Sequence, residues 1–233
     1  MIVILTGAGI SQESGIATFR DSGGLWEKVR IEDVATPGAF RKNPDMVYAF
    51  YNARRKQLLD SDIAPNPAHF ALALLEEQSA APVLVVTQNV DNLHERAGSK
   101  NLLHMHGELL KSRCAACGDV RQWEQDLDAT DACLACKRTG QLRPHIVWFE
   151  EMPLYMDAIY EALSCCRTFV SIGTSGNVYP AAGFAREARS RGARVVELNM
   201  EPSQGAAVFH DGRYGPAGKI VPIWVDEVLE AQR

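Results

Sequence analysis

The sequence predicts an α/β protein with a doubly wound parallel sheet, because short apolar β-branched runs alternate with segments of helical pattern. Each run is continuously apolar rather than alternating, which is typical of strands buried on both faces of a parallel sheet. The runs that predict these strands span residues 2–5, 83–86, 168–172 and 194–198. Helical patterns lie between them, over 67–78 and 181–191.

Polar or glycine-rich turns follow the first three predicted strands, at 6–9, 87–89 and 173–176, and the fourth strand ends at Asn199. Ligands of doubly wound sheets bind beyond the carboxyl ends of the strands, so these turns are expected to line one crevice. The residues that would meet there are Gly7, Gly9, Gln88, Asn89, Asp91, Gly173, Ser175 and Asn199.

Two segments interrupt this alternation. Residues 26–61 contain a helical pattern from Pro44 to Leu59, and residues 110–142 carry two cysteine pairs in a polar segment. We expect both segments to contribute to a smaller helical and zinc-binding domain. The remaining residues, 1–25, 62–109 and 143–233, are expected to form a Rossmann-like domain.

The composition is that of a soluble globular protein, with 46% hydrophobic and 23% charged residues and a net charge of −5 among 233 residues. Mild acidity argues against nucleic acid or an anionic membrane as a bulk partner. The apolar runs are too short for a bilayer span or a signal-peptide core. Because a predicted strand begins at Ile2, we expect a cytoplasmic protein without an N-terminal targeting segment.

The turn Gly7-Ala8-Gly9 follows a strand, as a dinucleotide-binding turn does, and its glycines would let the backbone approach a pyrophosphate. Gln12 stands at the third-glycine position, and the acidic residue expected about 20 residues later is missing from its usual context. The ordinary dehydrogenase fingerprint is therefore incomplete. A tight strand-to-helix turn without a ligand is the alternative.

Four cysteines are arranged as two Cys-x2-Cys pairs separated by residues 118–132. Such knuckles supply four thiolates to one tetrahedral Zn²⁺, and a site filled by four sulfurs leaves no position for a reactive water. We therefore predict a structural zinc site formed by Cys114, Cys117, Cys133 and Cys136. Disulfides are the alternative, and they fit a cytosolic chain poorly. Cys165 and Cys166 lie in an apolar helical context and are expected to be small buried residues.

His104 and His106 are two residues apart, which would place them on the same face of a strand. Such a pair could be a metal site, a general base with a neighbour, or packed structural histidines. The spacing alone does not decide among these alternatives.

Tyr51 and Arg54 are spaced i, i+3 on the predicted helix, so that a phenol and a guanidinium would share one face and could together hold a carboxylate. Because Arg55 and Lys56 follow immediately, a solvated basic helix face explains the same pattern.

Several motifs, taken together in their order along the chain, resemble the sirtuin family over nearly all 233 residues. They are the segments Gly7 to Arg20 and Thr87 to His94, the pair His106-Gly107, the four cysteines, Gly173 to Ser175, and Asn199 to Glu201. The resemblance implies an NAD-dependent protein-lysine deacylase with one structural zinc ion, acting on acylated proteins. A monomer is expected.

Within this family the segment Ala49 to Arg55 is most similar to the bacterial CobB-type, class III members. This similarity implies that Tyr51 and Arg54 bind the carboxylate of succinyl-lysine or malonyl-lysine, and that acetyl groups are removed as well. Val147, Phe149 and Val178 would contact the substrate.

The resemblance also implies the mechanism. The acyl oxygen attacks the anomeric carbon of the nicotinamide ribose and expels nicotinamide, and His106 then acts as general base toward the ribose hydroxyls. The products are free lysine, nicotinamide and O-acyl-ADP-ribose. Asn89 and Asp91 would hold the nicotinamide and ribose for reaction. The residues implied to bind NAD are Gly7, Ala8, Gly9, Ser14, Thr18, Phe19, Arg20, Trp26, Gln88, Asn89, Val90, Asp91, Gly173, Thr174, Ser175, Asn199, Met200, Glu201 and Ala217.

Two residues depart from the family pattern: Ala17 replaces a frequent proline, and Glu150 replaces the usual glycine of Phe-Gly-Glu. Glu150 leaves a weakly catalytic NAD-binding and zinc-bearing interaction module as an alternative function. An NAD-dependent oxidoreductase is a second alternative, against which the incomplete fingerprint argues. A metal-dependent hydrolase using His104 and His106 lacks the clustered carboxylates of an open metal site.

Overall fold

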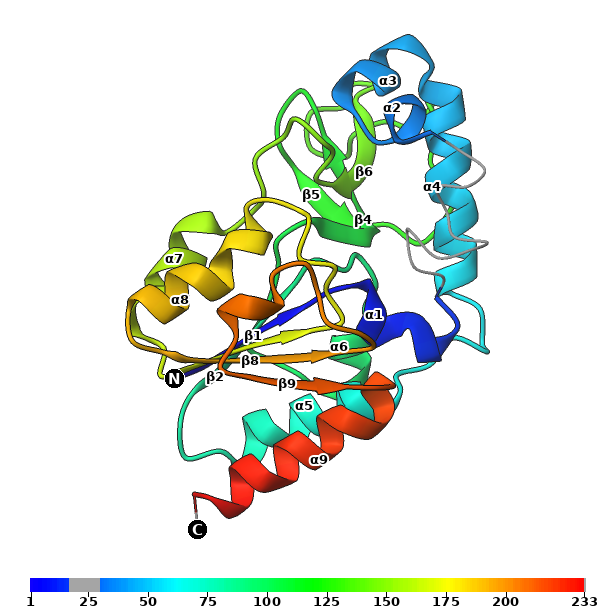
Figure 1. Cartoon of the computed structure of the whole chain (residues 1–233). Coiled ribbons are helices and arrows are strands. Elements are labelled where there is room, and N and C mark those ends of the chain that lie inside the picture. The colour runs from blue at the N-terminus through cyan, green and yellow to red at the C-terminus, as the bar shows by residue number, and fades with distance from the viewer. Residues whose placement is uncertain (17–29, 233) are drawn as a thin grey trace.

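The computed structural model describes residues 1–16 and 30–232. Figure 1 shows a larger part built around one sheet and a smaller part above it that contains β4–β6 and α2–α4. The described helices are α1 (Ala8–Ser11), α2 (Ile31–Val34), α3 (Pro37–Lys42), α4 (Pro44–Leu58), α5 (Pro67–Gln78), α6 (Leu93–Ala97), α7 (Met156–Cys165), α8 (Phe184–Ser190) and α9 (Ala217–Glu230). The described strands are β1 (Ile2–Thr6), β2 (Val83–Thr87), β3 (Leu102–His104), β4 (Gly107–Cys114), β5 (Val120–Gln122), β6 (Leu142–Ile146), β7 (Thr168–Ile172), β8 (Arg194–Asn199) and β9 (Asp211–Tyr214).

The larger sheet is parallel throughout and has the order β3-β2-β1-β7-β8-β9. In β1, Ile4 lies opposite Val85 of β2 and Val170 of β7. The chain leaves β1 for β2 on one side and continues from β7 to β9 on the other. The two sides diverge beside β1, so the carboxyl ends of β1, β2 and β7 meet at the position where such sheets bind ligands.

Alternate residues of the strands pack on opposite layers of helices, which confirms the predicted doubly wound fold. Ile2 and Ile4 belong to a core with α5 and α9, whereas Val3 and Leu5 belong to a core with α7 and α8. Figure 1 shows these helix pairs on the two faces of the sheet. Burial on both faces is the reason that the strand sequences are continuously apolar.

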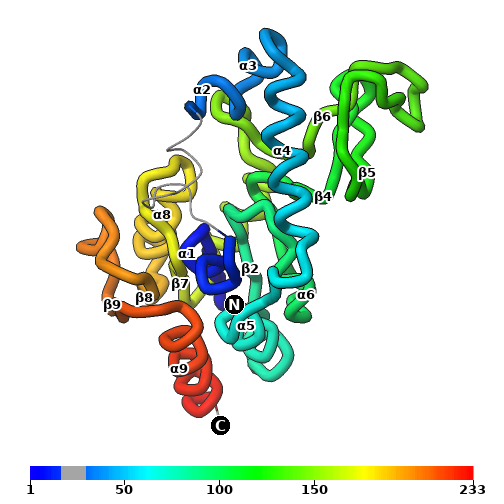
Figure 2. The backbone as a smooth tube through the Cα atoms, turned by 90° about the vertical axis from the view of Figure 1, so that its right-hand side faces the viewer, coloured from blue at the N-terminus to red at the C-terminus, as the bar shows by residue number. Residues whose placement is uncertain are grey.

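The smaller sheet is antiparallel, with the order β5-β4-β6, and α4 packs against it. Figure 2 shows α4 running from α2 and α3 at the top of the molecule down past β4. The helix begins with Pro44 in its first turn, and the Asn43 side chain accepts a hydrogen bond from the Met46 amide at 3.2 Å. This start is typical of capped helices.

Some elements differ from the sequence predictions. The expected helix over 181–191 is divided into a 3₁₀ turn, Ala181–Gly183, and α8. The short edge strands β3 and β9 were not predicted, because three- or four-residue strands carry little periodic signal. The smaller sheet was not predicted either. Cys166 is buried as predicted, but the prediction for Cys165 was wrong, because its side chain is exposed at the end of α7. Among the described residues, no helix has the length and apolar character needed to cross a membrane.

Candidate functional site

The turns after β1 and β7 lie in direct backbone contact at the crevice. The Gly9 amide donates to the Gly173 carbonyl at 2.9 Å, and a β-carbon at Gly9 would lie only 2.7 Å from Gly173 Cα. Gly173 has a φ of +61°, and a β-carbon there would lie 2.5 Å from the Ile10 nitrogen. The close contact between the two strand ends therefore requires glycine at both positions. This requirement arises from packing alone and does not depend on a bound pyrophosphate.

Asn89 and Asp91, after β2, meet the first turn through Ser11. The Asn89 side-chain amide donates to the Gly7 carbonyl and to Ser11 Oγ, both at 3.1 Å, and Ser11 Oγ donates to Asp91 Oδ2 at 3.0 Å. Burial raises the pKa of Asp91, although Leu93 and Ser11 donate hydrogen bonds to its carboxylate. Ser11 was not among the predicted site residues, but it lies inside the quoted glycine motif.

His106 lies in the turn between β3 and β4, so only His104 of the two histidines lies in a strand. His106 Nδ1 is 3.1 Å from the Gln88 carbonyl oxygen. A carbonyl only accepts, so Nδ1 carries the hydrogen and Nε2 of the neutral ring has the free lone pair. Burial lowers the pKa of His106, although the hydrogen bond to Gln88 favours the charged ring. The result is a neutral imidazole that can accept a proton at Nε2.

Tyr51 lies on the side of α4 that faces the smaller sheet, and Arg54 follows about one turn later on the same helix. The buried Tyr51 hydroxyl accepts a hydrogen bond from Trp148 Nε1 at 2.9 Å, and within the described residues its own proton has no acceptor. The Arg54 guanidinium stacks on the Phe50 ring and donates from Nη1 to the Phe50 carbonyl at 3.0 Å. Arg54 Nε is buried and, in the described part of the chain, has no partner.

The charge of Arg54 persists at neutral pH, because burial lowers the pKa of its guanidinium only to about 10. Burial raises the pKa of Tyr51 well above its ordinary value, against the hydrogen bond from Trp148 and the charge of Arg54. The phenol is therefore a neutral donor beside a cation. Both groups are suited to bind a carboxylate.

A partly buried ion pair also contacts Trp148. The Arg143 guanidinium lies 3.3 Å from the centroid of the Trp148 ring and donates to both oxygens of Glu151, at 2.6 and 2.9 Å. Glu151 also accepts from the Trp148 main-chain amide at 2.9 Å. Arg143, Trp148 and Glu151 were not predicted from the sequence, since none belongs to a spacing pattern that singles it out.

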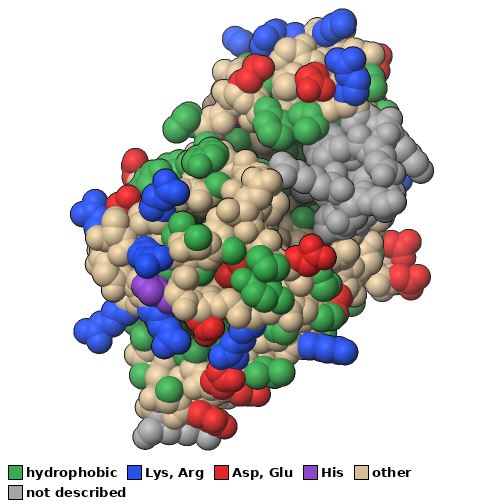
Figure 3. Space-filling view, in the orientation of Figure 1, with side chains coloured by type: hydrophobic (Ala, Val, Ile, Leu, Met, Phe, Trp, Pro, Cys, Tyr) green, Lys and Arg blue, Asp and Glu red, His purple; other side chains and the backbone are tan. Residues whose placement is uncertain are grey.

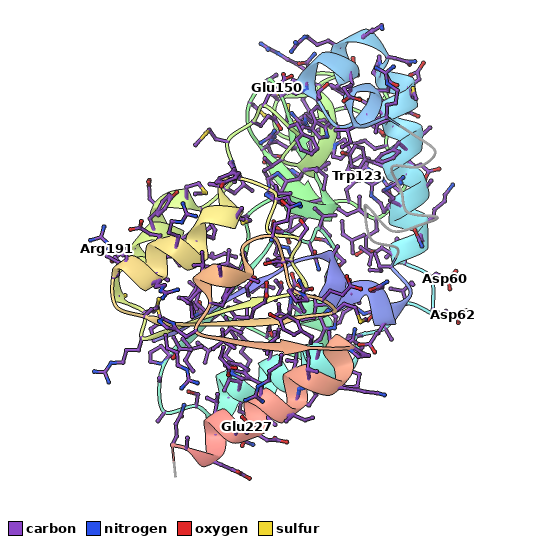
Figure 4. The ribbon with its side chains drawn as sticks, in the orientation of Figure 1. Asp60, Asp62, Trp123, Glu150, Arg191 and Glu227 are labelled. Atoms are coloured by element: carbon purple, nitrogen blue, oxygen red, sulfur yellow. The ribbon has the colours of Figure 1, made fainter. Side chains whose placement is uncertain are left out.

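Phe149 and Glu150 are exposed at the edge of the smaller part, where Figure 4 labels Glu150. The backbone of Glu150 has a φ of +75°, in the left-handed region that favours glycine. The backbone at position 150 thus has a torsion typical of glycine, although the residue there is a glutamate with a charged side chain. Of the other predicted substrate contacts, Val147 donates its amide to the His106 carbonyl at 2.9 Å, and Val178 is half-buried before the 3₁₀ turn.

Replacement of Glu150 with glycine is expected to raise the free energy of unfolding by about 1 kcal/mol, because the left-handed torsion costs a non-glycine residue about that amount. Urea denaturation of the two proteins measures this difference. Lys137→Gly is the matched comparison, since Lys137 also has a positive φ, of 62°, but lies in the cysteine segment. A loss of stability in Glu150→Gly would contradict the assignment of strain to this residue.

The other end of the crevice contains Asn199, whose side-chain amide donates to the Thr174 carbonyl at 2.8 Å. Thr174 Oγ1 in turn lies 2.8 Å from Ser171 Oγ. Ser175, Met200 and Glu201 are exposed, and Ala217 is buried at the start of α9. Next to this edge, the fully buried carboxylate of Glu197 accepts a hydrogen bond from the Tyr214 hydroxyl at 3.1 Å.

The remaining predicted NAD contacts are divided between described and undescribed residues. Gln88 and Val90 are half-buried, and the carbonyl of Val90 accepts from the Leu109 amide at 2.8 Å. Ser14 is buried, and its hydroxyl accepts from the Asn66 side chain at 3.0 Å. The predictions at Thr18, Phe19, Arg20 and Trp26, and the departure at Ala17, lie outside the described residues.

The four cysteines form a compact cluster of free thiols. Cys114 Sγ is 3.7 Å from Cys136 Sγ, and Cys117 Sγ is 3.7 Å from Cys133 Sγ. All four sulfur atoms lie within 4.8 Å of one another. A tetrahedral Zn²⁺ with Zn–S bonds of about 2.3 Å requires sulfur atoms about 3.8 Å apart. The cluster therefore fits one zinc ion and no disulfide.

Replacement of Cys133 with serine is expected to remove the zinc and lower the Tm by about 10 °C, because 1 kcal/mol shifts the Tm of a domain of this size by about 2–4 °C and a lost metal costs several. Metal content by plasma mass spectrometry and thermal denaturation measure both effects. Cys165→Ser is the control, since this exposed cysteine lies outside the cluster. Full zinc content and an unchanged Tm in Cys133→Ser would contradict the assigned ligand.

Comparison with known proteins gives consistent matches. The model of the Sir2 family matches residues 7–180. The chain is 60% identical over 228 residues to an NAD-dependent protein deacylase of Pasteurella multocida, covering 98% of this chain and 97% of that protein. It is 57% identical to the NAD-dependent protein deacylase of Salmonella typhimurium, covering 98% of this chain and 84% of that protein.

Solved structures match over the whole chain. A complex of a Sir2 homologue with NAD has a TM-score of 0.90 and 36% identity, covering 100% of this chain and 90% of that one. A Sir2 protein in complex with a deacetylated peptide and 3′-O-acetyl ADP-ribose has a TM-score of 0.82 and 28% identity, covering 99% of this chain and 93% of that one. The similarity extends across both sheets.

Proposed function

Because this chain belongs to the Sir2 family, we propose that it is an NAD-dependent protein-lysine deacylase that removes acetyl, succinyl and malonyl groups. The observation that carries the acidic acyl preference is the pair of buried donors at Tyr51 and Arg54, neither of which is fully satisfied within the described residues. A buried donor without an acceptor is costly, so this position fits a ligand that brings oxygen atoms.

The residues at the strand ends fit NAD. Its phosphates would lie against the main chain of Gly7, Ala8 and Gly9, and its adenosine end would lie near Ser175 and Asn199. When bound, NAD supplies the electrophilic anomeric carbon and the ribose that accepts the acyl group. Asn89 and Asp91, held through Ser11, would fix the nicotinamide and its ribose at the end of β2.

His106 would act as the general base. Its Nδ1–H is held by the Gln88 carbonyl, and the free lone pair at Nε2 can take a proton from a ribose hydroxyl. The lowered pKa of His106 keeps this nitrogen unprotonated at neutral pH. Gln88 is thus a positioning residue that selects the reactive tautomer through its main chain.

Trp148 would determine how Tyr51 donates. Since the indole N–H occupies the Tyr51 oxygen, the phenol proton is left for a second partner, and an acyl carboxylate between Tyr51 and Arg54 would be that partner. An acetyl group has no carboxylate, so it would form no hydrogen bond with the Tyr51 hydroxyl or the Arg54 guanidinium. Both kinds of substrate can therefore bind, with a preference set by these donors.

The proposed partners are acylated proteins in the cytoplasm, bound to a monomeric enzyme without nucleic acid or membrane. Figure 3 shows hydrophobic side chains on both sides of the indentation between the two parts of the molecule. The exposed large apolar residues include Phe149, Met152, Tyr155 and Tyr179. Such side chains are suited to contact an extended peptide.

The test is incubation of the protein and NAD with matched acetyl-lysine and succinyl-lysine peptides, followed by mass spectrometry. Free nicotinamide and O-acyl-ADP-ribose are expected from both peptides. Reduced cofactor without nicotinamide would instead indicate an oxidoreductase. NAD binding without any product would indicate an interaction module, and Glu150→Gly would then be the first variant assayed for recovered turnover.

A further inference from the structure

His104 is bound on both of its ring nitrogens by groups that accept hydrogen bonds. Its Nδ1 is 3.2 Å from the Asn89 carbonyl oxygen, and its Nε2 is 2.8 Å from Glu95 Oε1. A carbonyl and a carboxylate both accept, so both nitrogens of His104 carry hydrogen, and the buried ring is an imidazolium. His106, with a single acceptor at Nδ1, is neutral. The Glu95 carboxylate therefore gives two neighbouring histidines opposite protonation states.

The titratable groups around His104 come from α6, from the loop before it and from β4. Glu95 and His94 belong to α6, Asp91 lies in the loop before it, and Glu108 and Lys111 belong to β4. Burial opposes the charge on His104, but the hydrogen bond that His104 donates to Glu95 and the charges of Glu95 and Glu108 outweigh it, and the pKa of His104 is raised. Burial, followed by the charges of His69 and His104, lowers the pKa of His94 well below its ordinary value, so His94 is neutral.

These side chains form an ion-pair network rather than an open cation site. Lys111 Nζ lies 2.6 Å from Glu108 Oε2, and the proton at His104 Nε2 lies between the ring and Glu95. Glu95, His104 and Glu108 place their ligand atoms within 4.8 Å of one another, but positive charge is already present beside both carboxylates.

We propose that the charged pair of His104 and Glu95 positions the loop Gln88–Asp91 for NAD, so that His104 is a positioning residue of the reaction. The proposal rests on the deacylase function proposed above. His104 and His106 donate to consecutive carbonyls of this loop, Asn89 and Gln88. The first contact fixes the main chain from which the Asn89 side chain reaches Gly7 and Ser11. A loose loop would disorder Asn89 and Asp91 together.

The position of His104 in the fold explains why one residue can do this. His104 ends the edge strand β3, directly opposite Thr87 at the end of β2. The loop begins at the next residue after Thr87, and the Met105 amide donates to the Thr87 carbonyl at 3.0 Å. The side chain of His104 therefore extends the sheet's hydrogen bonding by two residues into the loop.

Two substitutions separate the two contacts of His104. Asparagine places its amide nitrogen where Nδ1 stands and can keep the bond to Asn89, whereas glutamine reaches the Nε2 position and can keep the bond to Glu95. His104→Gln is expected to raise KM for NAD about tenfold, because a charge-assisted hydrogen bond to the loop is lost. His104→Asn is expected to raise it less, with kcat in both variants near that of the wild type. Equal effects of the two substitutions would overturn the proposal.

Glu95→Gln tests the charge. In the wild type, the pKa of His104 is raised, so His104 keeps its charge to a higher pH than an ordinary histidine does. Without the carboxylate, burial dominates, and His104 loses its proton at lower pH. KM for NAD in Glu95→Gln is therefore expected to exceed that of the wild type by a larger factor, about fivefold, at about pH 8 than at about pH 5.5. Glu77→Gln removes an equal charge from the exposed face of α5 and should change neither value. Superimposable pH profiles of Glu95→Gln and the wild type would overturn the proposal.

A measurement without turnover separates this inference from the deacylase function. The ¹⁵N chemical shifts of the wild-type histidines, assigned with His104→Asn, should show both nitrogens of His104 protonated at about pH 7.5 and a neutral His106. Calorimetric NAD binding by Glu95→Gln at the same two pH values should follow the predicted change in KM. A neutral His104 at neutral pH overturns the inference even if deacylation is found. A charged His104 with the expected binding supports the positioning of the loop even if deacylation fails.

Discussion

Replacement of His106 with tyrosine or asparagine is expected to lower kcat/KM by about 10³-fold for both acetyl and succinyl peptides, because both variants lack the basic nitrogen at Nε2. Asparagine is the sharper variant, since its amide can still donate to the Gln88 carbonyl that now holds Nδ1 at 3.1 Å. Steady-state release of nicotinamide and O-acyl-ADP-ribose measures the loss. Calorimetric NAD binding and the Tm should remain those of the wild type.

The pH dependence of the wild type provides an independent check. A general base must be unprotonated, so kcat/KM is expected to fall as the pH drops through the pKa of His106, which burial holds below its ordinary value of 6.5. This acidic limb should be absent from the residual activity of His106→Asn. Normal turnover in that variant would remove His106 from the mechanism.

The combination of Tyr51→Phe with Arg54→Met is expected to lower kcat/KM for succinyl and malonyl peptides by about 10²-fold or more, while deacetylation stays within about threefold of the wild type. The acidic acyl group loses a neutral donor and a cation, whereas an acetyl group uses neither. Competition between a succinyl and an acetyl peptide in one reaction, with both deacylated products quantified by mass spectrometry, gives the ratio of the two kcat/KM values directly.

Two further variants test the parts of this acyl pocket. Trp148→Phe removes the N–H that occupies the Tyr51 oxygen and should lower the succinyl rate while retaining an aromatic ring over Arg143. Lys56→Met removes an exposed positive charge from the same helix, which pairs with Asp126 across 2.9 Å, and should leave the ratio unchanged. Equal loss of deacetylation and desuccinylation in the double variant would exclude a carboxylate-binding role for Tyr51 and Arg54.

The architecture of the larger sheet could be predicted because its signal is local. Four of its six strands are continuous apolar runs, and α5 has the predicted bounds Pro67–Gln78. The smaller sheet could not be predicted, since all three residues of β5 are exposed and β6 contains Pro144, so neither strand shows a recognisable alternation of apolar and polar residues. Its strands run from Gly107 to Ile146. The division into domains stays a prediction.

The site could be predicted where the chemistry depends on the residue type alone. It could not be predicted where the chemistry depends on a contact with a residue that is distant in the sequence. The cysteine spacing alone predicted the cluster, and the structure brings its sulfur atoms together. Spacing could not separate His104 from His106, because the difference arises from Glu95, nine residues from His104 on another element. Tyr51 and Arg54 share a helix face as predicted, but the Trp148 donor that orients Tyr51 is 97 residues away. Such contacts depend on tertiary packing, which one sequence does not display.

Arg55 was grouped with a solvated helix face in one interpretation of the sequence, but its side chain is only 1% exposed. Its Nε donates to the Leu109 carbonyl of β4 at 3.2 Å, and its Nη1 donates to Asn52 Oδ1 at 2.7 Å. Asn52 exchanges two hydrogen bonds, both of 3.0 Å, with the main chain of Leu127. Polar side chains on the inner face of α4 thus bind main-chain atoms of the smaller part.

Main-chain partners are present whatever side chains a relative carries at those positions. These contacts hold the depth and rotation of α4 without depending on the side chains at positions 109 and 127, whereas its apolar residues still pack on side chains of the smaller part such as Trp148. An exchange of acyl preference by grafting would therefore have to transfer the fifteen residues of α4 together with Trp148, which donates to Tyr51.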